Sequence, residues 1–227
     1  MNKIEQLRVT GQLPTPKGVA LAILEVCRHE DVSMREVSRL VQTDPALSGR
    51  LLRLANSAGY ASRAVISIDE AILRLGMATV RQLAMGFSLV EQNCQGPCNG
   101  FDYPGFWSHS LLMAVASHEL GSVVRLGSPD ELFSCSLLAQ IGQLALATAY
   151  PVQYSAILEQ KVDGEALLEL ERERLALDHI ELTAFILEDC GIPKALGEPI
   201  SHHEAPEKSG FAEGSRPYEL THLFFLA

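Results

Sequence analysis

The chain has 227 residues, of which 47% are hydrophobic and 20% are charged. This composition is typical of a globular protein with a sizeable core, and it excludes disordered, fibrous and disulfide-scaffold chains. The net charge of −10 is unevenly distributed, because residues 1–92 carry 11 basic and 9 acidic groups whereas residues 93–227 carry 7 and 19. The acidity of the second part disfavours nucleic acids and acidic membranes as its partners.

The first residues, Met1–Glu5, lack the apolar run of a secretory signal, and no stretch approaches 18 uncharged apolar residues. The five cysteines are odd in number and thinly spread, which indicates reduced thiols. We therefore expect a cytoplasmic protein that does not bind membranes.

Apolar residues recur at helical spacing along nearly the whole chain, which predicts an all-α fold. Two serine–glutamate pairs, Ser33 with Glu36 and Ser67 with Glu70, fit the capping box that begins a helix. Asp44 and Ser128, each followed by proline, are further predicted caps, with proline as the first helical residue. In the first part we predict an extended lead-in at 13–16 and helices at 2–7, 17–28, 34–42, 45–57, 68–75 and 78–92.

The segment Asn93–Gly105 is rich in glycine, proline and asparagine, which predicts a loop between two helical subdomains. The predicted organisation is an N-terminal subdomain at 1–92, a connecting loop at 93–105 and a second subdomain at 106–227. The apolar C-terminal end of the second subdomain has no helix cap, so we expect the protein to continue beyond Ala227. Within the second subdomain we predict helices at 106–126, 130–149, 152–161, 165–175, 179–190 and 193–203, a polar loop at 204–216, and a last helix from Pro217.

Histidines fall at predicted helix positions in the second part, where facing helices could bring them together. His109 begins a long helix, His179 begins another, and the pair His202 and His203 ends a third. Adjacent helical residues point about 100° apart, so at most one member of the pair faces straight into the core. Each histidine alone is more typical of a packed or surface position than of a ligand.

The order of these histidines around a motif helix, Leu137–Leu144, resembles the layout of the HD phosphohydrolase superfamily. Over essentially its whole length the chain resembles the HDOD family, the HD-related output domains of bacterial signalling proteins. The resemblance implies two helical subdomains, of which the second is a degenerate HD-like helical bundle. It is carried by Leu13–Pro16 (LPTP), Gln42–Leu47 (QTDPAL), Arg50–Ala58 (RLLRLANSA) and Ile68–Gly76 (IDEAILRLG).

Where the HD enzymes carry a metal-binding His-Asp pair, this chain has Ala139 and Gln140. Alanine has no ligand atom, and a neutral amide is a weak ligand for a hard divalent cation. The resemblance therefore implies a non-catalytic relative with no catalytic residue, no metal and no cofactor. The candidate ligand-binding residues of its degenerate pocket are His109, Gln140, His179, His202 and His203.

The sequence favours a non-catalytic bacterial signal-transduction domain that acts as an output or scaffold through protein–protein interaction. Its partner is an unidentified signalling protein, and a fused receiver or cyclic-dinucleotide turnover domain is one form that such a partner takes. Two alternatives stay open: a sensor that binds a nucleotide or anion in the degenerate pocket, and a residual metal-dependent phosphohydrolase. Nucleic-acid binding is disfavoured, since residues 35–81 offer only seven arginines against four acidic residues.

Overall fold

The computed structural model describes residues 3–11, 13–14, 17–27, 32–57 and 63–227. These residues form fourteen α-helices and one 3-10 helix with no strand, which confirms the predicted all-α class. The chain divides into two compact units, which we call the 16–91 unit (Pro16–Glu91) and the 92–227 unit (Met1–Thr15 together with Gln92–Ala227).

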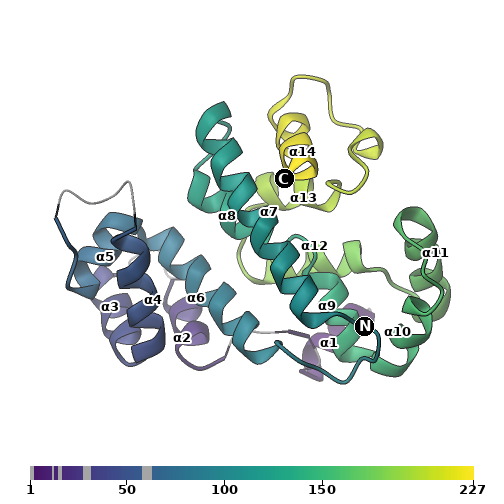
Figure 1. Ribbon diagram of the computed structural model, residues 1–227, viewed down its shortest axis with the longest axis horizontal. Helices are drawn as coiled ribbons and strands as arrows, with labels where there is room; N and C mark the ends of the chain where they lie inside the picture. Colours follow the sequence, from purple (N-terminus) through teal and green to yellow (C-terminus); the bar gives the residue numbers. More distant parts are fainter. Residues whose placement is uncertain (1–2, 12, 15–16, 28–31, 58–62) are drawn as a thin grey trace. The chain divides into compact units, whose positions relative to one another are not determined.

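The 16–91 unit consists of short helices whose buried faces follow the predicted spacing (Figure 1). Helix α3 packs against its neighbours α2, α4 and α5, and it buries Val37 and Val41. Leu51 and Ala55 are the fully buried residues of α4. The helices are α2 (Gly18–Val26), α3 (Met34–Gln42), α4 (Pro45–Ala55), α5 (Ile68–Leu75) and α6 (Met77–Gln92).

The helix starts of this unit are capped by nearby side chains, as the sequence predicts. Ser33 and Glu36 form a complete capping box at the start of α3. Ser67 accepts a hydrogen bond from the backbone N–H of Glu70, and Asp44 caps α4, in which proline is the first residue. Each of these interactions spans only two or three residues of sequence.

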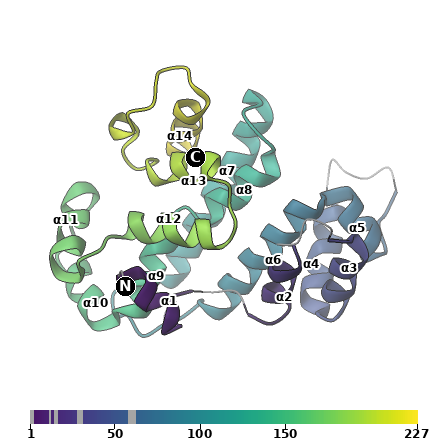
Figure 2. The same cartoon turned by 180° about the vertical axis from the view of Figure 1, so that it is seen from behind.

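The 92–227 unit is built around α7, its longest helix, which packs beside α8 (Figures 1 and 2). Helix α12 packs against both α9 and α13, and α13 packs against α14. The helices are α1 (Lys3–Val9), α7 (Tyr103–Val124), α8 (Pro129–Leu137), α9 (Ile141–Ala149), α10 (Pro151–Leu158), α11 (Gly164–Leu175), α12 (His179–Asp189), α13 (Lys194–Ser201), the 3-10 helix η1 (Pro206–Lys208) and α14 (Arg216–Leu226).

The first helix, α1, belongs to the 92–227 unit although the sequence places it in the N-terminal subdomain. Arg8 pairs with Asp189 at the end of α12 at 3.1 Å, and the Lys3 ammonium donates to the carbonyl of Leu175 at the end of α11. These partners lie more than 170 residues away in sequence, so local patterning carries no sign of them.

The single helix predicted at 130–149 is wrong, because the chain breaks into α8 and α9 at Leu138–Gln140. At the break the backbone hydrogen bonds run between residues three apart, as in a 3-10 turn. The N–H of Ala139 donates to the carbonyl of Ser136, and the N–H of Ile141 donates to the carbonyl of Leu138. Neither glycine nor proline marks this point, so the redirection follows from the packing of α9 against α12. The predicted polar loop at 204–216 also contains the short helix η1.

One described stretch, Pro129–Ala149, is long and apolar enough by length and mean hydropathy to cross a membrane. It comprises α8, the break and α9, and 72% of its most apolar window is buried inside the protein. Leu132, Ile141 and Leu144 are fully buried. These helices therefore contribute the core of the 92–227 unit.

An aromatic cluster anchors the start of α7 and leads to the histidine region. Trp107, the only tryptophan, is buried, and its indole N–H donates to the carbonyl of Asn93 at 3.0 Å. Phe101 contacts the rings of both Phe106 and Tyr154. The cluster thereby packs against Tyr154 of α10, whose hydroxyl takes part in the site described next.

Candidate functional site

The chain reverses direction between α11 and α12, and this turn places the central histidine. Helix α11 ends at Leu175, and its C-cap residue Ala176 has a φ of 53°, in the left-handed region that alanine rarely adopts. Two residues later Asp178 caps α12 in a reciprocal box with Glu181. Asp178 also accepts a hydrogen bond from Arg172 at 2.7 Å, so both ends of the turn are fixed.

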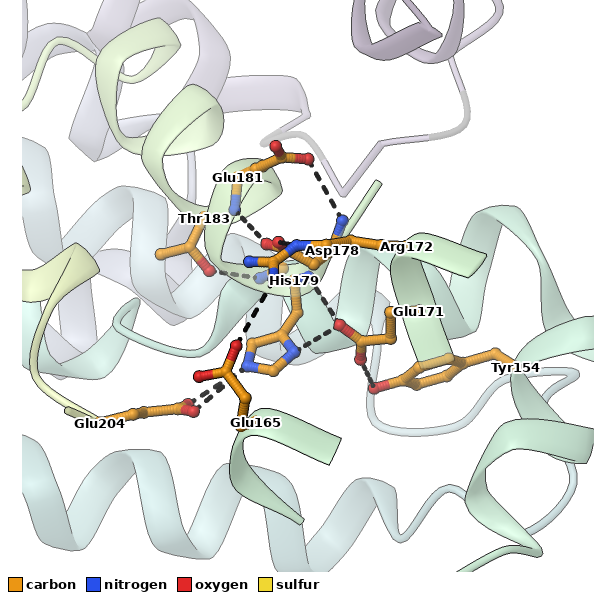
Figure 3. Close-up of polar contacts among 10 residues, drawn as sticks. Tyr154, Glu165, Glu171, Arg172, Asp178, His179, Glu181, Thr183 and Glu204 are labelled. Atoms are coloured by element: carbon orange, nitrogen blue, oxygen red, sulfur yellow. Dashed lines mark hydrogen bonds and ion pairs between the residues drawn. The ribbon is translucent and has the colours of Figure 1, made fainter. Parts of the chain in front are cut away.

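His179, the first residue of α12, lies between two carboxylates (Figure 3). Its Nδ1 is 2.7 Å from Oε2 of Glu171, and its Nε2 is 3.3 and 3.4 Å from the two carboxylate oxygens of Glu204. A histidine donates from both ring nitrogens only when it is protonated. The arrangement therefore fits an imidazolium held between two anions.

Glu171 is fully buried and is the anionic centre of the network. Besides the ring, it accepts the backbone N–H of His179 at 2.9 Å and the hydroxyl of Tyr154 at 3.1 Å. A buried carboxylate is costly to desolvate unless donors of this kind surround it. Burial, followed by the charge of Glu171, raises the pKa of Tyr154, so its hydroxyl stays protonated and donates.

The charges of His179 and Glu204 follow from the same contacts. Burial alone would disfavour the charged form of His179, but the hydrogen bonds that the ring donates to Glu171 and Glu204 outweigh it and raise the pKa of His179 to about 9. For Glu204, burial favours the neutral acid, yet its hydrogen bond with His179 and the nearby histidines lower the pKa of Glu204 below its usual range. At neutral pH the site therefore holds an imidazolium between carboxylates.

Gly142 allows α9 to approach the start of α12. A Cβ at this position would lie 1.9 Å from the carbonyl oxygen of His179, which is far inside van der Waals contact. The backbone N–H of Gly142 donates to the Thr183 hydroxyl at 3.0 Å. This glycine of the sequence motif thus positions His179 through its backbone.

The electrostatic interactions of His203 bring three of the five predicted pocket residues into one region. His203 is buried, its Nδ1 lies 2.6 Å from the carbonyl of Ile200, and burial lowers the pKa of His203. The charges of His179 and His109 act on it too, so these three histidines and Glu204 share one region, with His109 on its exposed side. We call this group the histidine site.

The remaining two residues occupy different positions. The ring of His202 makes an edge contact with Phe211, with ring centroids 5.5 Å apart. Only His203 of the pair is buried, and because α13 ends at Ser201 neither histidine lies on the predicted helix to which the 100° rule refers. Gln140 is half-buried at the break before α9, and its side chain makes no cap hydrogen bond there.

Sequence reasoning missed Glu171, Glu204 and Tyr154, which make the strongest contacts with or around His179. A signal existed for Glu171, because it shares helical spacing with Leu168 and Leu175 and all three are buried. It was hidden in a run of alternating acidic and basic residues that is typical of a solvated helix face. Glu204 directly follows the histidine pair, in the segment predicted to be a polar loop.

The HD layout implies a divalent metal centre, and the residues present do not fit one. Ala139 is buried and has no ligand atom, while both ring nitrogens of His179 already face carboxylates. Over the described residues, no three His, Cys, Asp or Glu side chains are grouped so as to hold a metal ion. We therefore derive no metal-dependent step.

Comparison with known proteins gives one family match and several similar structures. The HDOD domain model matches residues 13–206, whereas no curated protein matches the chain. The MmoQ response regulator of Methylococcus capsulatus strain Bath is 40% identical, with 94% of this chain and 83% of that chain covered and a TM-score of 0.57.

Two other solved structures cover nearly all of this chain. A candidate phosphohydrolase of Shewanella amazonensis SB2B is 29% identical, with 98% of this chain and 77% of that chain covered and a TM-score of 0.71. An HDOD domain protein of Geobacter sulfurreducens is 20% identical with a TM-score of 0.70, covering 98% of this chain and 76% of that chain, which supports the fold alone.

Proposed function

This chain belongs to the HDOD family, and from that premise we propose that it is a non-catalytic signalling domain that acts by binding another protein. A role in signal transduction agrees with the family and with the similar response regulator. The proposed setting is the cytoplasm of a bacterium.

The proposal rests on one observation: the polar side chains of the histidine site are hydrogen-bonded to one another. His179 is held by Glu171 and Glu204, and Glu171 is held in turn by Tyr154. An imidazolium has no lone pair with which to bind a metal or accept a proton. The site therefore supports structure or binding, and it does not support a metal-activated hydroxide of the kind that phosphohydrolysis needs.

The proposed protein-binding surface lies on α7. Leu111, Leu112, Val115 and Val123 are 47–80% exposed and lie on one side of the helix at helical spacing, with the exposed Glu119 between Val115 and Val123. We call the four apolar residues the α7 face. Exposed apolar patches mark interaction sites in soluble proteins. Since residues 93–227 carry 7 basic and 19 acidic groups, the proposed partner offers an apolar surface flanked by basic residues.

The absence of catalysis is tested by elemental analysis of the purified protein and by hydrolysis assays. Linear and cyclic nucleotides are incubated with added Mg²⁺ or Mn²⁺. We expect no stoichiometric metal and no turnover. Stoichiometric metal together with turnover that is lost in His109→Ala would refute this part of the proposal.

The interaction is tested by crosslinking a tagged chain in cells and comparing two charge substitutions. Leu112→Glu lies on the α7 face, and Val152→Glu is the matched control at a 78% exposed position on α10. We expect a signalling protein that crosslinks to the wild type and to Val152→Glu, and that is lost in Leu112→Glu while the helical content is unchanged. Equal crosslinking to both variants would place the interface elsewhere.

A further inference from the structure

The two carboxylates that hold His179 are not equivalent. Glu171 is fully buried on a helix and accepts from three donor groups at 2.7–3.1 Å. The Glu204 side chain is 25% exposed, and its oxygens lie 3.3 and 3.4 Å from Nε2 of His179. Charge-assisted N–H···O bonds are usually 2.7–2.9 Å long, so the bond from His179 to Glu204 is weaker than the bond from His179 to Glu171.

Glu204 also occupies a less constrained segment than Glu171. It lies in the turn after α13, where the N–H of Ala205 donates to the carbonyl of His202. The next anchor along the chain is Pro206, which is buried in η1, so the part that can move is the short turn that carries Glu204.

The surroundings of Glu204 favour an anion. His179, His203 and His109 all act on the Glu204 carboxylate and favour its charged form against the effect of burial. His109 is exposed, so this side of the site reaches the surface. The donor at its centre, Nε2–H of His179, is held in place from behind by Glu171.

We propose that Glu204 is an internal substitute for an external oxyanion, and that a phosphate group binds in its place against His179, with His109 and His203 beside it. The phosphate accepts the hydrogen bond that Nε2 of His179 otherwise gives to the Glu204 carboxylate. This inference rests on the proposed function, because a non-catalytic site binds a phosphate without cleaving it.

Displacement of Glu204 also gives the site a means of signalling. When Glu204 leaves His179, the turn after α13 loses its attachment to α12, and the segment up to η1 is freed to move. Ligand binding thereby becomes a change in the surface around α13 and η1. The ligand has to compete with Glu204, so its apparent affinity is reduced by the fraction of time that Glu204 occupies the donor.

The test is calorimetric titration of the full chain with inorganic phosphate and, separately, with AMP, at constant ionic strength. In Glu204→Gln the competing charge is removed while the shape is kept, and we expect binding about tenfold tighter than in the wild type. Glu173→Gln is the matched control, because it neutralises an exposed carboxylate on α11 that lies outside the histidine site. It should bind phosphate as the wild type does.

Two further variants complete the test. Adding His179→Gln to Glu204→Gln should abolish the gain, because the central donor is lost. In Glu204→Ala, acetate should raise the melting temperature more than an equal concentration of chloride does, by filling the vacated carboxylate position. If Glu204→Ala does not fold, Glu204→Gln decides the question.

The results separate the outcomes clearly. If Glu204→Gln binds both phosphate and AMP more tightly than the wild type does, a free phosphate is a sufficient ligand. If it binds only AMP more tightly, the ligand is a phosphorylated metabolite. Either result supports the inference. Equal affinity in Glu204→Gln and the wild type would overturn it, as would a gain that survives His179→Gln. Release of phosphate from AMP in the same mixtures would instead contradict the proposed non-catalytic function.

Discussion

The 16–91 unit and the histidine site use polar side chains over very different distances in the chain. In the 16–91 unit, Ser33 bonds to Glu36 three residues away, and the contact is exposed to solvent. In the histidine site, Glu171 reaches His179 eight residues away, and His179 reaches Glu204 twenty-five residues away, with the first contact fully buried. An exposed local cap can be replaced by water, whereas a buried charge that loses its partner cannot, so the two regions should respond unequally to substitution.

The largest effect is expected for Glu171→Ala, which leaves the buried Tyr154 hydroxyl and one nitrogen of His179 without their acceptor. Removal of one member of a buried ion pair costs about 3–5 kcal/mol. The measurement is urea unfolding followed by the fluorescence of Trp107, which lies in the same unit. Glu173→Ala, at an exposed position on the same helix, is the control and should cost less than about 0.5 kcal/mol. A loss for Glu171→Ala as small as that of the control would show that the network adds no stability.

Gly142→Ala should be nearly as damaging, although it adds only a methyl group. The added Cβ would meet the carbonyl oxygen of His179, which is backbone and cannot rotate away. Overpacking of this kind costs about 3 kcal/mol. Gly197→Ala on α13 is the matched control, because a Cβ there has nothing within 4 Å, and it should be neutral or stabilising by about 0.5–1 kcal/mol. The same urea experiment compares the two, and equal stabilities would mean that α9 and α12 are not in close contact.

The pH dependence of stability gives a third way to test the comparison. The pKa of His179 is raised from 6.5 to about 9, so its imidazolium stabilises the folded state fully below pH 6.5 and that contribution is lost as the pH rises through 9. We expect a decrease of about 2 kcal/mol in the free energy of unfolding between pH 6.5 and 9. Burial lowers the pKa of His203, so protonation of His203 affects stability at a pH below the range from 6.5 to 9.

The control for this measurement is His179→Gln, whose stability should change little over the same range. A wild-type protein with a flat profile between pH 6.5 and 9 would contradict the assignment of an imidazolium. The 16–91 unit has no comparable buried ion pair among its described residues, so the effect should be confined to the other unit.

The smallest effect is expected in the 16–91 unit. Ser33→Ala removes one half of the capping box of α3 and should cost about 1 kcal/mol. Unfolding followed by circular dichroism measures the loss, and Ser33→Asn, which can also cap a helix, should restore most of it. A cost above that of Glu171→Ala would reverse the comparison between the two regions.

Much of the fold was predictable because helix formation depends on short-range patterns. The box at Ser33 and Glu36 and the cap at Asp44 lie within one turn of the residues they bond, and the structure confirms both. The predicted cap at Ser128 is wrong in part, since proline begins α8 but the Ser128 side chain makes no cap hydrogen bond.

Part of the candidate site was also predictable. The order of His109, His179 and His203 indicated a shared region, and their electrostatic interaction in the folded chain agrees with it. His202 could not be separated from His203 by sequence alone beyond the rule that one of them turns away. The acidic partners were missed, because Glu171 and Glu204 lie in segments whose composition is typical of solvent-exposed chain.

The sequence by itself determined the all-α class and most helix starts, because each follows from residue type and local spacing. That Ala139 and Gln140 replace a metal-binding pair was implied by the resemblance to the HD layout. Only the tertiary structure decided that α8 and α9 are separate helices and that His179 is an imidazolium held by two carboxylates. The physical reason is that burial and charge pairing depend on which helices meet. A glutamate has the same local pattern whether it faces water or a histidine from another helix.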